Sequence, residues 1–279
     1  MKVPKAVITA AGASQRHLPL QTIVDSQARR RKTIGLLVDE AKSAGIDQVG
    51  LVISPGSSDL YAEAIDELDV TLTLIEQPEP RGYGHAVLSA ADFVGDDAFL
   101  LMVSDHLYVS ELPDKSCAAQ LVECASREGC MVSAVQPTHE GKLSYFGTVG
   151  GSLFEGQQGL FEVQSVLEKP SPTIAEQELL TPGLRHGYYL CFLGMHVLTP
   201  AIMPMLEEEF ASLEDGQALI LSDSLNLAAK SGRYLAHAIE GRRYDIDNRY
   251  GILMAQLALA LAGKHREEVL TGIIELLAQ

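Results

Sequence analysis

Two aspartates follow predicted strands at positions where they could hold a metal ion. Asp105 comes directly after the apolar run in "LLMVSDHL", and Asp245 lies in "RRYDIDNRYG", between a predicted strand and a predicted helix. A pair of aspartates can bind Mg²⁺ while phosphate oxygens complete its octahedral coordination. Asp247 has an alternative role, because an aspartate just before a helix is a common N-cap. The sequence therefore predicts a Mg²⁺ site at Asp105 and Asp245.

A turn of small residues follows the first apolar run of the chain. The stretch "AAGASQRHLP" places Ala11, Gly12 and Ser14 before Arg16. Small side chains let backbone N–H groups approach phosphate oxygens, and an arginine beyond them can contact two oxygens at once. The alternative interpretation is a tight turn followed by a surface charge.

Two further segments carry polar groups after predicted strands. In "QPEPRGYGHA", Gln77 could recognise the edge of a base through its paired donor and acceptor, and Gly82 would permit close contact. The alternative is a strand–loop–helix connection built from turn residues. In "VLEKP", Glu168 and Lys169 could contact sugar hydroxyls and a phosphate, or they could form a surface ion pair.

The elements that must position these residues alternate between apolar strands and amphipathic helices. Continuous apolar strands separated by helices are typical of a mostly parallel sheet covered on both faces. Ligands bind such sheets outside the carboxyl ends of the strands, where the polar segments above lie. We expect strands at 5–10, 49–54, 70–76, 98–103, 131–136, 161–167, 188–195 and 234–239. We expect helices at 32–44, 58–68, 85–93, 116–128, 200–209, 222–230, 249–262 and 266–277.

The alternation loosens in the second half of the chain. The glycine-rich and aromatic segment "SYFGTVGGSLFEGQQGLFEV" predicts a small β insertion or lid beside the main sheet. The last two predicted helices carry wide apolar faces, which we expect to pack in the core. Since no repeat or clear linker is visible, we predict one domain over residues 1–279. Its expected class is α/β, with a doubly wound, mostly parallel, Rossmann-like sheet.

Composition excludes some classes of partner. The formal net charge is -16, and a surface this acidic repels nucleic acids and anionic lipid. None of the four cysteines forms a C-x-x-C pair, which favours reduced, mostly buried thiols in a cytosolic protein. The apolar stretch "GILMAQLALALAG" is too short to cross a bilayer core of about 30 Å. We therefore predict a cytoplasmic protein with no nucleic-acid or membrane partner.

The order and spacing of these motifs resemble the bacterial-type UTP–glucose-1-phosphate uridylyltransferase family of sugar-1-phosphate nucleotidyltransferases. The matching pieces are "AGASQRHLP", "GYGHAVL", "VSD", "SYFGTVGG", "VLEKP" and "YDIDN". The resemblance covers nearly the whole chain, and "GYGHAVL" and "LEKP" are its most specific parts. It implies transfer of a uridylyl group from UTP to glucose 1-phosphate, giving UDP-glucose and pyrophosphate with Mg²⁺.

The resemblance also implies a role for each motif residue. A nucleotide would lie against Ala11 and Gly12, with its base read by Gln77 and Gly82 and its triphosphate held by Arg16. The sugar would contact Gly147 and Glu168, and its phosphate would contact Lys169. Mg²⁺ would be bound by Asp105 and Asp245.

Four departures from the family pattern affect these expectations. The family's second loop glycine is Ser14 here, which is a mild change, and its threonine is Gln15. The family's Pro–Lys pair, whose lysine contacts the phosphates, is missing after Pro19. We hypothesise that Lys32, or one of the arginines at 29–31, supplies the charge, the alternative being a solvated basic loop. The family's late glycine is Asp247, and the asparagine expected near the sugar aligns with Tyr188 or Tyr189.

Two alternatives to this function stay open. One is a nucleotidyltransferase that uses another base, from dTTP or CTP, or another sugar 1-phosphate. The other is a sensor that binds a nucleotide sugar without catalysis, which the missing lysine favours. A homo-oligomer is compatible with the family, although the sequence shows no interface.

Overall fold

The fold is built on one large sheet whose strands come from the whole chain. The computed structural model describes residues 1–12, 17–65 and 70–278. The nine-stranded sheet has the order β5-β4-β1-β6-β11-β8-β12-β10-β9. Its strands are β1 (Lys5–Thr9), β4 (Gln48–Ile53), β5 (Thr71–Glu76), β6 (Phe99–Val103), β8 (Met131–His139), β9 (Thr148–Leu153), β10 (Leu160–Leu167), β11 (Tyr188–Leu198) and β12 (Tyr234–Ala238).

Two short ribbons accompany the large sheet. Strand β2 (Thr22–Val24) pairs with β3 (Arg30–Lys32), and β7 (His106–Ser110) pairs with β13 (Gly241–Asp245), both antiparallel. The sequence analysis did not predict these strands. Strands β3 and β13 are rich in charged residues, β2 has only three residues, and β7 begins three positions after β6 ends, so none of them shows a separate apolar run of the kind that marks a buried strand.

The first half of the sheet is parallel, and helices cover both of its faces. Strands β5, β4, β1 and β6 pair in parallel. Along β1, Ala6 and Ile8 join one buried apolar cluster with α1 (Thr33–Ser43) and α5 (Cys117–Glu128), whereas Val7 joins a second cluster on the opposite face. The second cluster includes residues of α3 (Tyr83–Leu88), α4 (Ala91–Val94), α7 (Ile202–Ser212) and α8 (Leu221–Ser231). The predicted doubly wound α/β class is confirmed.

The second half of the sheet is mixed. Strand β11 is antiparallel to both β6 and β8, and β10 is antiparallel to both β12 and β9. Only β8 and β12 are parallel there, so the prediction of a mostly parallel sheet holds for the first half alone. The segment predicted to form a β insertion supplies β9 and β10, which continue the main sheet at its edge instead of lying beside it.

Most predicted helices are present within a residue or two of their expected ends. The predicted helix at 85–93 is divided into α3 and α4. Helix α2 (Ser58–Ile65) begins where expected, and the end of its predicted range lies outside the described residues. The short helix α6 (Pro172–Glu178) and the 3₁₀ turns Leu18–Leu20 and Glu140–Tyr145 were not predicted. All four cysteines are free and buried, as expected.

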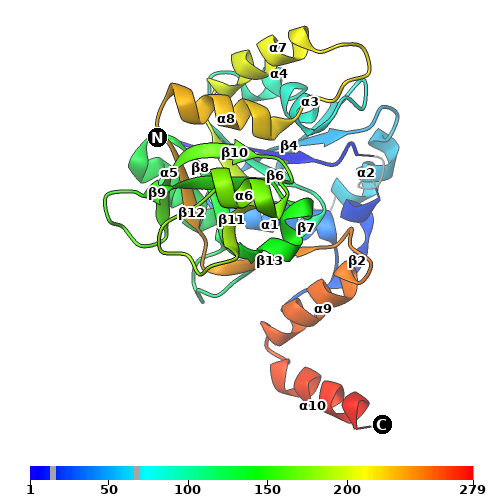
Figure 1. Ribbon diagram of the computed structural model, residues 1–279. Helices are drawn as coiled ribbons and strands as arrows, with labels where there is room; N and C mark the ends of the chain where they lie inside the picture. Colours follow the sequence, from blue (N-terminus) through cyan, green and yellow to red (C-terminus); the bar gives the residue numbers. More distant parts are fainter. Residues whose placement is uncertain (13–16, 66–69, 279) are drawn as a thin grey trace.

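The C-terminal helices extend away from the sheet (Figure 1). Helix α9 (Gly251–Leu261) contacts β13 and β2, and α10 (Arg266–Leu277) follows it and packs on α9. The prediction that both helices pack in the core is wrong for α10, because none of its described residues is buried, and it is wrong for most of α9, where only Gly251 and Ala255 are buried. The chain has left the sheet by then, so no second apolar layer covers α10. No helix in the described part of the chain has the length and apolar character needed to cross a membrane.

Candidate active site

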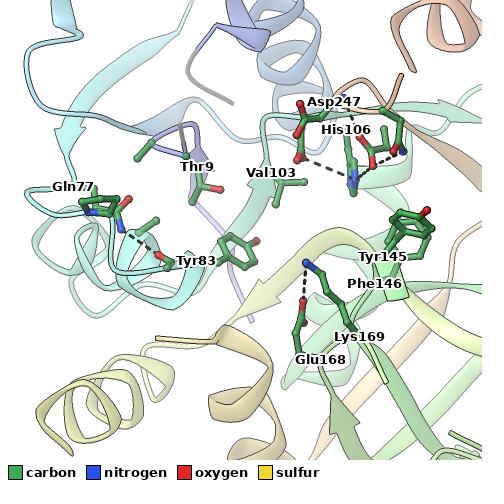
Figure 2. A pocket seen from close by; sticks show the side chains of 18 of the residues that line it. Thr9, Gln77, Tyr83, Val103, His106, Tyr145, Phe146, Glu168, Lys169 and Asp247 are labelled. Atoms are coloured by element: carbon green, nitrogen blue, oxygen red, sulfur yellow. Dashed lines mark hydrogen bonds and ion pairs between the residues drawn. The ribbon is translucent and has the colours of Figure 1, made fainter. Parts of the chain in front are cut away.

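A cavity of about 640 Å³ opens at the carboxyl ends of the central strands. It collects residues that end or follow five strands, namely β1, β5, β6, β10 and β13. Gln77 lies toward one end of the cavity, and Lys169 and His106 lie toward the other (Figure 2). The predicted site residues that line it are Ala11, Gly12, Gln77, Gly82, Asp105, Glu168, Lys169 and Asp245. The fold therefore brings together predicted site residues that are far apart in the sequence.

The turn after β1 is anchored to the neighbouring strand β4. The Ala10 N–H donates to the carbonyl oxygen of Val52 at 2.7 Å, and the Ser54 hydroxyl donates to the carbonyl oxygen of Ala11 at 2.8 Å. These bonds fix the backbone of Ala11 and Gly12 along the cavity wall. Arg16, predicted to hold a triphosphate, lies outside the described residues.

The amide of Gln77 is held in one orientation by the loop that follows it. Its Nε2 donates to the carbonyl oxygen of Gly82 at 3.1 Å and lies 3.1 Å from Nδ1 of His85. Since a carbonyl only accepts, the nitrogen end of the amide must face Gly82. The oxygen Oε1 is then the end of Gln77 left for a ligand. Gly82 itself has φ +95, and a Cβ there would lie 2.6 Å from the carbonyl oxygen of Leu219, so only glycine fits.

Three potential metal ligands meet at the other end of the cavity. The β7–β13 ladder pairs His106 with Asp245, and the Ile246 N–H donates to the carbonyl oxygen of Asp105 at 2.7 Å. One ligand atom from each of Asp105, His106 and Asp245 lies within 4.8 Å of the others. The two predicted aspartates are thus brought together. His106 was not predicted as a ligand, although it stands beside Asp105 in "SDH".

Burial and neighbouring charges shift the pKa values of this cluster. Burial raises the pKa of the Asp245 carboxyl above its usual range, with His106 acting against that shift and Asp105 adding to it. Burial, followed by the nearby Arg243 guanidinium, lowers the pKa of His106. Both oxygens of Asp245 accept hydrogen bonds, Oδ1 from the Asp247 N–H at 3.0 Å and Oδ2 from the Asn248 amide at 2.7 Å. A divalent cation would therefore meet an oriented carboxylate.

Asp247 lines the cavity and does not cap a helix. The residue at the N-cap of α9 is Tyr250, three positions beyond Asp247. The alternative interpretation of Asp247 as an N-cap is therefore wrong, because the turn that follows β13 delays the start of the helix. Its exposed side chain stands beside the metal-ligand cluster (Figure 2).

Glu168 and Lys169 both line the cavity, close to Gly147. Lys169 has φ +46, a conformation that costs an L-residue about 1–2 kcal/mol, so the surrounding structure imposes it. Its Nζ lies 3.8 Å from Oε1 of Glu168, whose Oε2 accepts a hydrogen bond from the Ser222 hydroxyl at 2.6 Å. Gly147 lines a small side cavity of about 120 Å³ that also contains Glu168 and Ser222. A Cβ at Gly147 would lie 2.7 Å from the Phe192 ring, which explains the glycine.

Lys32 lies apart from this cavity. It ends β3, is exposed, and is not among the described residues that line the cavity. The neighbouring Arg29 and Arg31 form ion pairs with Asp25 and Asp39. Lys32 and Arg30 form no ion pair with a described residue. The role predicted for Lys32 stays a prediction.

Several aromatic residues of the site were not predicted from the sequence. Tyr83, Tyr145 and Phe146 line the cavity (Figure 2). Tyr188 instead lines an adjacent cavity of about 560 Å³, and Tyr189 is buried. "GYGHAVL" and "SYFGTVGG" contain the first three residues, so the motifs located these rings without indicating which way they face.

The chain is similar in sequence to known proteins. The sequence model described as "Nucleotidyl transferase" matches residues 5–241. A UTP–glucose-1-phosphate uridylyltransferase of Streptococcus pneumoniae is 29% identical over 93% of this chain and 91% of that protein. A UTP–glucose-1-phosphate uridylyltransferase 2 of Streptococcus pyogenes is 28% identical over 99% of this chain and 96% of that protein.

Solved structures share the fold. The UTP-bound UGPase from Acinetobacter baumannii superposes with a TM-score of 0.77 at 24% identity, over 99% of this chain and 100% of that one. A UDP-glucose pyrophosphorylase complexed with UDP-glucose gives a TM-score of 0.76 at 22% identity, over 92% of this chain and 98% of that one.

Proposed function

This chain belongs to the nucleotidyl transferase family, and we propose that it transfers a uridylyl group from UTP to glucose 1-phosphate. The observation that carries the proposal is the single cavity that joins Gln77 and Gly82 at one end with Asp105, Asp245, Glu168 and Lys169 at the other. Relatives at 28–29% identity carry the name of this activity. UDP-glucose and pyrophosphate would be the products.

The chemistry requires charge neutralisation and positioning more than a general base. A sugar phosphate is largely dianionic at neutral pH, because its second pKa is about 6. One of its oxygens forms a bond to the α-phosphorus of UTP while the bond from that phosphorus to the β-phosphate oxygen breaks, and pyrophosphate leaves. The nucleophile already carries its electron pair, so no side chain has to remove a proton. The task of the site is to hold two anions in line.

We propose that Lys169 lowers the repulsion between these anions. Its side chain lines the cavity, with Nζ 3.8 Å from Oε1 of Glu168, so the ammonium group could reach phosphates bound there. A fixed cation at a developing charge acts most strongly in a site that excludes water. Arg16 would serve the triphosphate in the same way, and we keep Lys32 as a candidate for the charge that the missing Pro–Lys pair would supply.

Asp105 and Asp245 would hold a divalent cation, for which we propose Mg²⁺ as the physiological ion. Buried and partly buried oxygens at one cavity wall, with Asp245 oriented by two hydrogen bonds, fit such an ion. A bound divalent ion supplies electrostatic stabilisation to phosphate oxygens. Asp105 and Asp245 would hold that ion at the wall of the cavity.

Glu168 is the proposed contact for the sugar. The Ser222 hydroxyl occupies one lone pair of Oε2 and fixes the carboxylate, which leaves Oε1 to accept a hydrogen bond from a sugar hydroxyl. Gly147 and the small side cavity beside Glu168 provide space for a ring. A pyranose presents several hydroxyl donors, so an oriented carboxylate beside such a space suits it.

We also propose that the whole chain forms one domain, including the helices beyond residue 241. The side chain of Gln256 in α9 accepts from the Val24 N–H and donates to the Val24 carbonyl oxygen, each at 2.8 Å. These two bonds tie α9 to β2. Limited proteolysis that released α9 before the sheet unfolds would contradict a single domain.

The direct test measures pyrophosphate release with purified protein and Mg²⁺. UTP, dTTP, CTP, ATP and GTP are each combined with glucose, galactose and N-acetylglucosamine 1-phosphates. We expect the highest kcat/KM for UTP with glucose 1-phosphate. A maximum elsewhere would keep the reaction class and change the substrate. Binding of UDP-glucose with no pyrophosphate release in any combination would instead support a sensor and overturn the proposal.

A further inference from the structure

An imidazole stands between the two carboxylates of the metal-ligand cluster. Nε2 of His106 lies 4.0 Å from Oδ1 of Asp105 and 4.0 Å from Oδ2 of Asp245 (Figure 2). The side chain is buried, and Nε2 has no hydrogen-bond partner among the described residues at this distance. Within the described part of the chain, this ring nitrogen faces two carboxylates at ion-pair distance and makes no hydrogen bond.

The other ring nitrogen decides which end of His106 can act as a ligand. Nδ1 lies 3.1 Å from the carbonyl oxygen of Leu193. A carbonyl only accepts, so Nδ1 carries the hydrogen of this bond, and in the neutral ring Nε2 carries a lone pair. Histidines that bind metals are commonly oriented in this way, with the second nitrogen donating to a carbonyl.

The adjacent strand is shaped to accept this ring. The pairing of β11 with β8 shifts register between Phe192 and His196, and Gly194 within that interval has φ +81. A Cβ on Gly194 would lie 2.4 Å from Nδ1 of His106. The Tyr108 hydroxyl donates to the Gly194 carbonyl oxygen at 3.1 Å and secures the bulge. The position of the imidazole is thus fixed by neighbouring elements as well as by its own strand.

The three ligand atoms lie close enough for small side-chain movements to bring them around one cation. Metal–ligand bonds of about 2.1 Å place two ligand atoms about 3.0 Å apart at a right angle and about 4.2 Å apart on opposite sides of the ion. The two distances from Nε2 are 4.0 Å, within that range. All three ligand atoms lie within 4.8 Å of one another, so a small side-chain movement would bring them around one ion.

We propose that His106 Nε2 is a direct third ligand beside Asp105 and Asp245, and that this nitrogen shifts the site's preference from Mg²⁺ toward Mn²⁺ and other first-row divalent ions. Mg²⁺ favours oxygen ligands, whereas imidazole suits transition-metal ions. This inference rests on the proposed function only in assuming that the reaction uses a divalent cation. It adds a nitrogen ligand to the two aspartate ligands.

The test is spectroscopic and uses the wild-type protein without substrate. Mn²⁺ is added to the metal-free protein, and electron spin-echo envelope modulation is recorded for the bound ion. We expect modulation from one directly bound ¹⁴N nucleus. A spectrum of bound Mn²⁺ without ¹⁴N modulation would overturn the proposal, and so would the absence of saturable Mn²⁺ binding. Either result would leave uridylyl transfer with Mg²⁺ to be judged by the pyrophosphate assay.

Two variants and one control separate direct ligation from a structural role. His106→Asn should abolish the ¹⁴N signal and lower the ratio of Mn²⁺ to Mg²⁺ affinity by at least about tenfold in calorimetry. Gly194→Ala keeps the imidazole but displaces it, so the signal should weaken with His106 still present. His186→Asn removes an exposed histidine elsewhere and should change neither measurement. An unchanged affinity ratio in a folded His106→Asn protein would refute direct ligation.

Discussion

The orientation of Gln77 predicts how the site distinguishes uracil from cytosine. Nε2 is held at Gly82, so Oε1 is the group that a base would meet. Uracil presents an N3–H donor at its pairing edge, whereas N3 of cytosine is an acceptor. UTP can therefore satisfy Oε1, and CTP would place two acceptors against each other.

The size of this discrimination follows from the burial of the amide. Gln77 is only 4% exposed, so water does not readily compensate a missing hydrogen bond. Rotating the amide to suit CTP would break the bond to Gly82. A buried unsatisfied polar group costs about 1–3 kcal/mol, which corresponds to about 5- to 150-fold in kcat/KM. We therefore expect the kcat/KM of the wild-type protein to be higher for UTP than for CTP by a factor within that range.

The substitution that tests this reasoning is Gln77→Leu, which has a similar size and no acceptor. The ratio of kcat/KM for UTP and CTP should fall toward one, because neither base then gains a bond or suffers an unpaired acceptor. The ratio is measured on one preparation, so a partly unfolded sample affects both substrates equally. A Gln77→Leu protein that keeps the wild-type ratio would refute the assignment of Oε1 as the base-reading atom.

Three further predictions concern other charged residues. Lys169→Ala should lower kcat by about 10²–10³, with partial recovery in Lys169→Arg, and a loss under threefold in steady-state assays would argue against its role. Lys32→Ala should reduce turnover more than the matched Arg30→Ala, and equal effects would indicate a solvated basic loop. Burial raises the pKa of Glu40 from 4.5 to about 7, so the folded state binds its proton more tightly than the unfolded state. Its contribution to stability is present below pH 4.5 and is lost as pH rises through 7. Urea unfolding at pH 5 and pH 8 should show wild type losing up to about 3 kcal/mol relative to Glu40→Gln, and parallel pH profiles would contradict this.

The sequence was sufficient for the parts of the fold that depend on local pattern. Strands such as β1 and β6 are nearly continuous apolar runs because both of their faces are buried, and that pattern is visible without a structure. Strand β3, with the sequence RRK, is exposed, and only its pairing with β2 makes it a strand. Helix α10 has an apolar pattern typical of packed helices, yet it contacts only α9 strongly, and none of its described residues is buried.

In the site, too, local sequence patterns predicted some features, whereas others depend on residues far away in the sequence. Asp105 and Asp245 were predictable because residues that follow strands of an α/β sheet gather at one edge. The position of His106 Nε2 depends on a carbonyl of Leu193, 87 positions away, at a bulge that no local pattern marks. The orientation of the Gln77 amide likewise depends on the loop that returns to it. The motif identified the residue, but it could not show that Oε1 is the atom available to a base.

The pairing of β7 with β13 also makes the metal-ligand cluster a cross-link. Asp105 and Asp245 are separated by about 140 positions, and their strands meet in a ribbon of five residue pairs outside the main sheet. An ion shared by both strands closes that long loop only in the folded protein, so binding stabilises it by mass action, by about 2.7 kcal/mol at a hundredfold excess over Kd. Helices α9 and α10 follow β13 after a short turn. Metal binding would therefore hold two distant segments of the chain together in the folded protein.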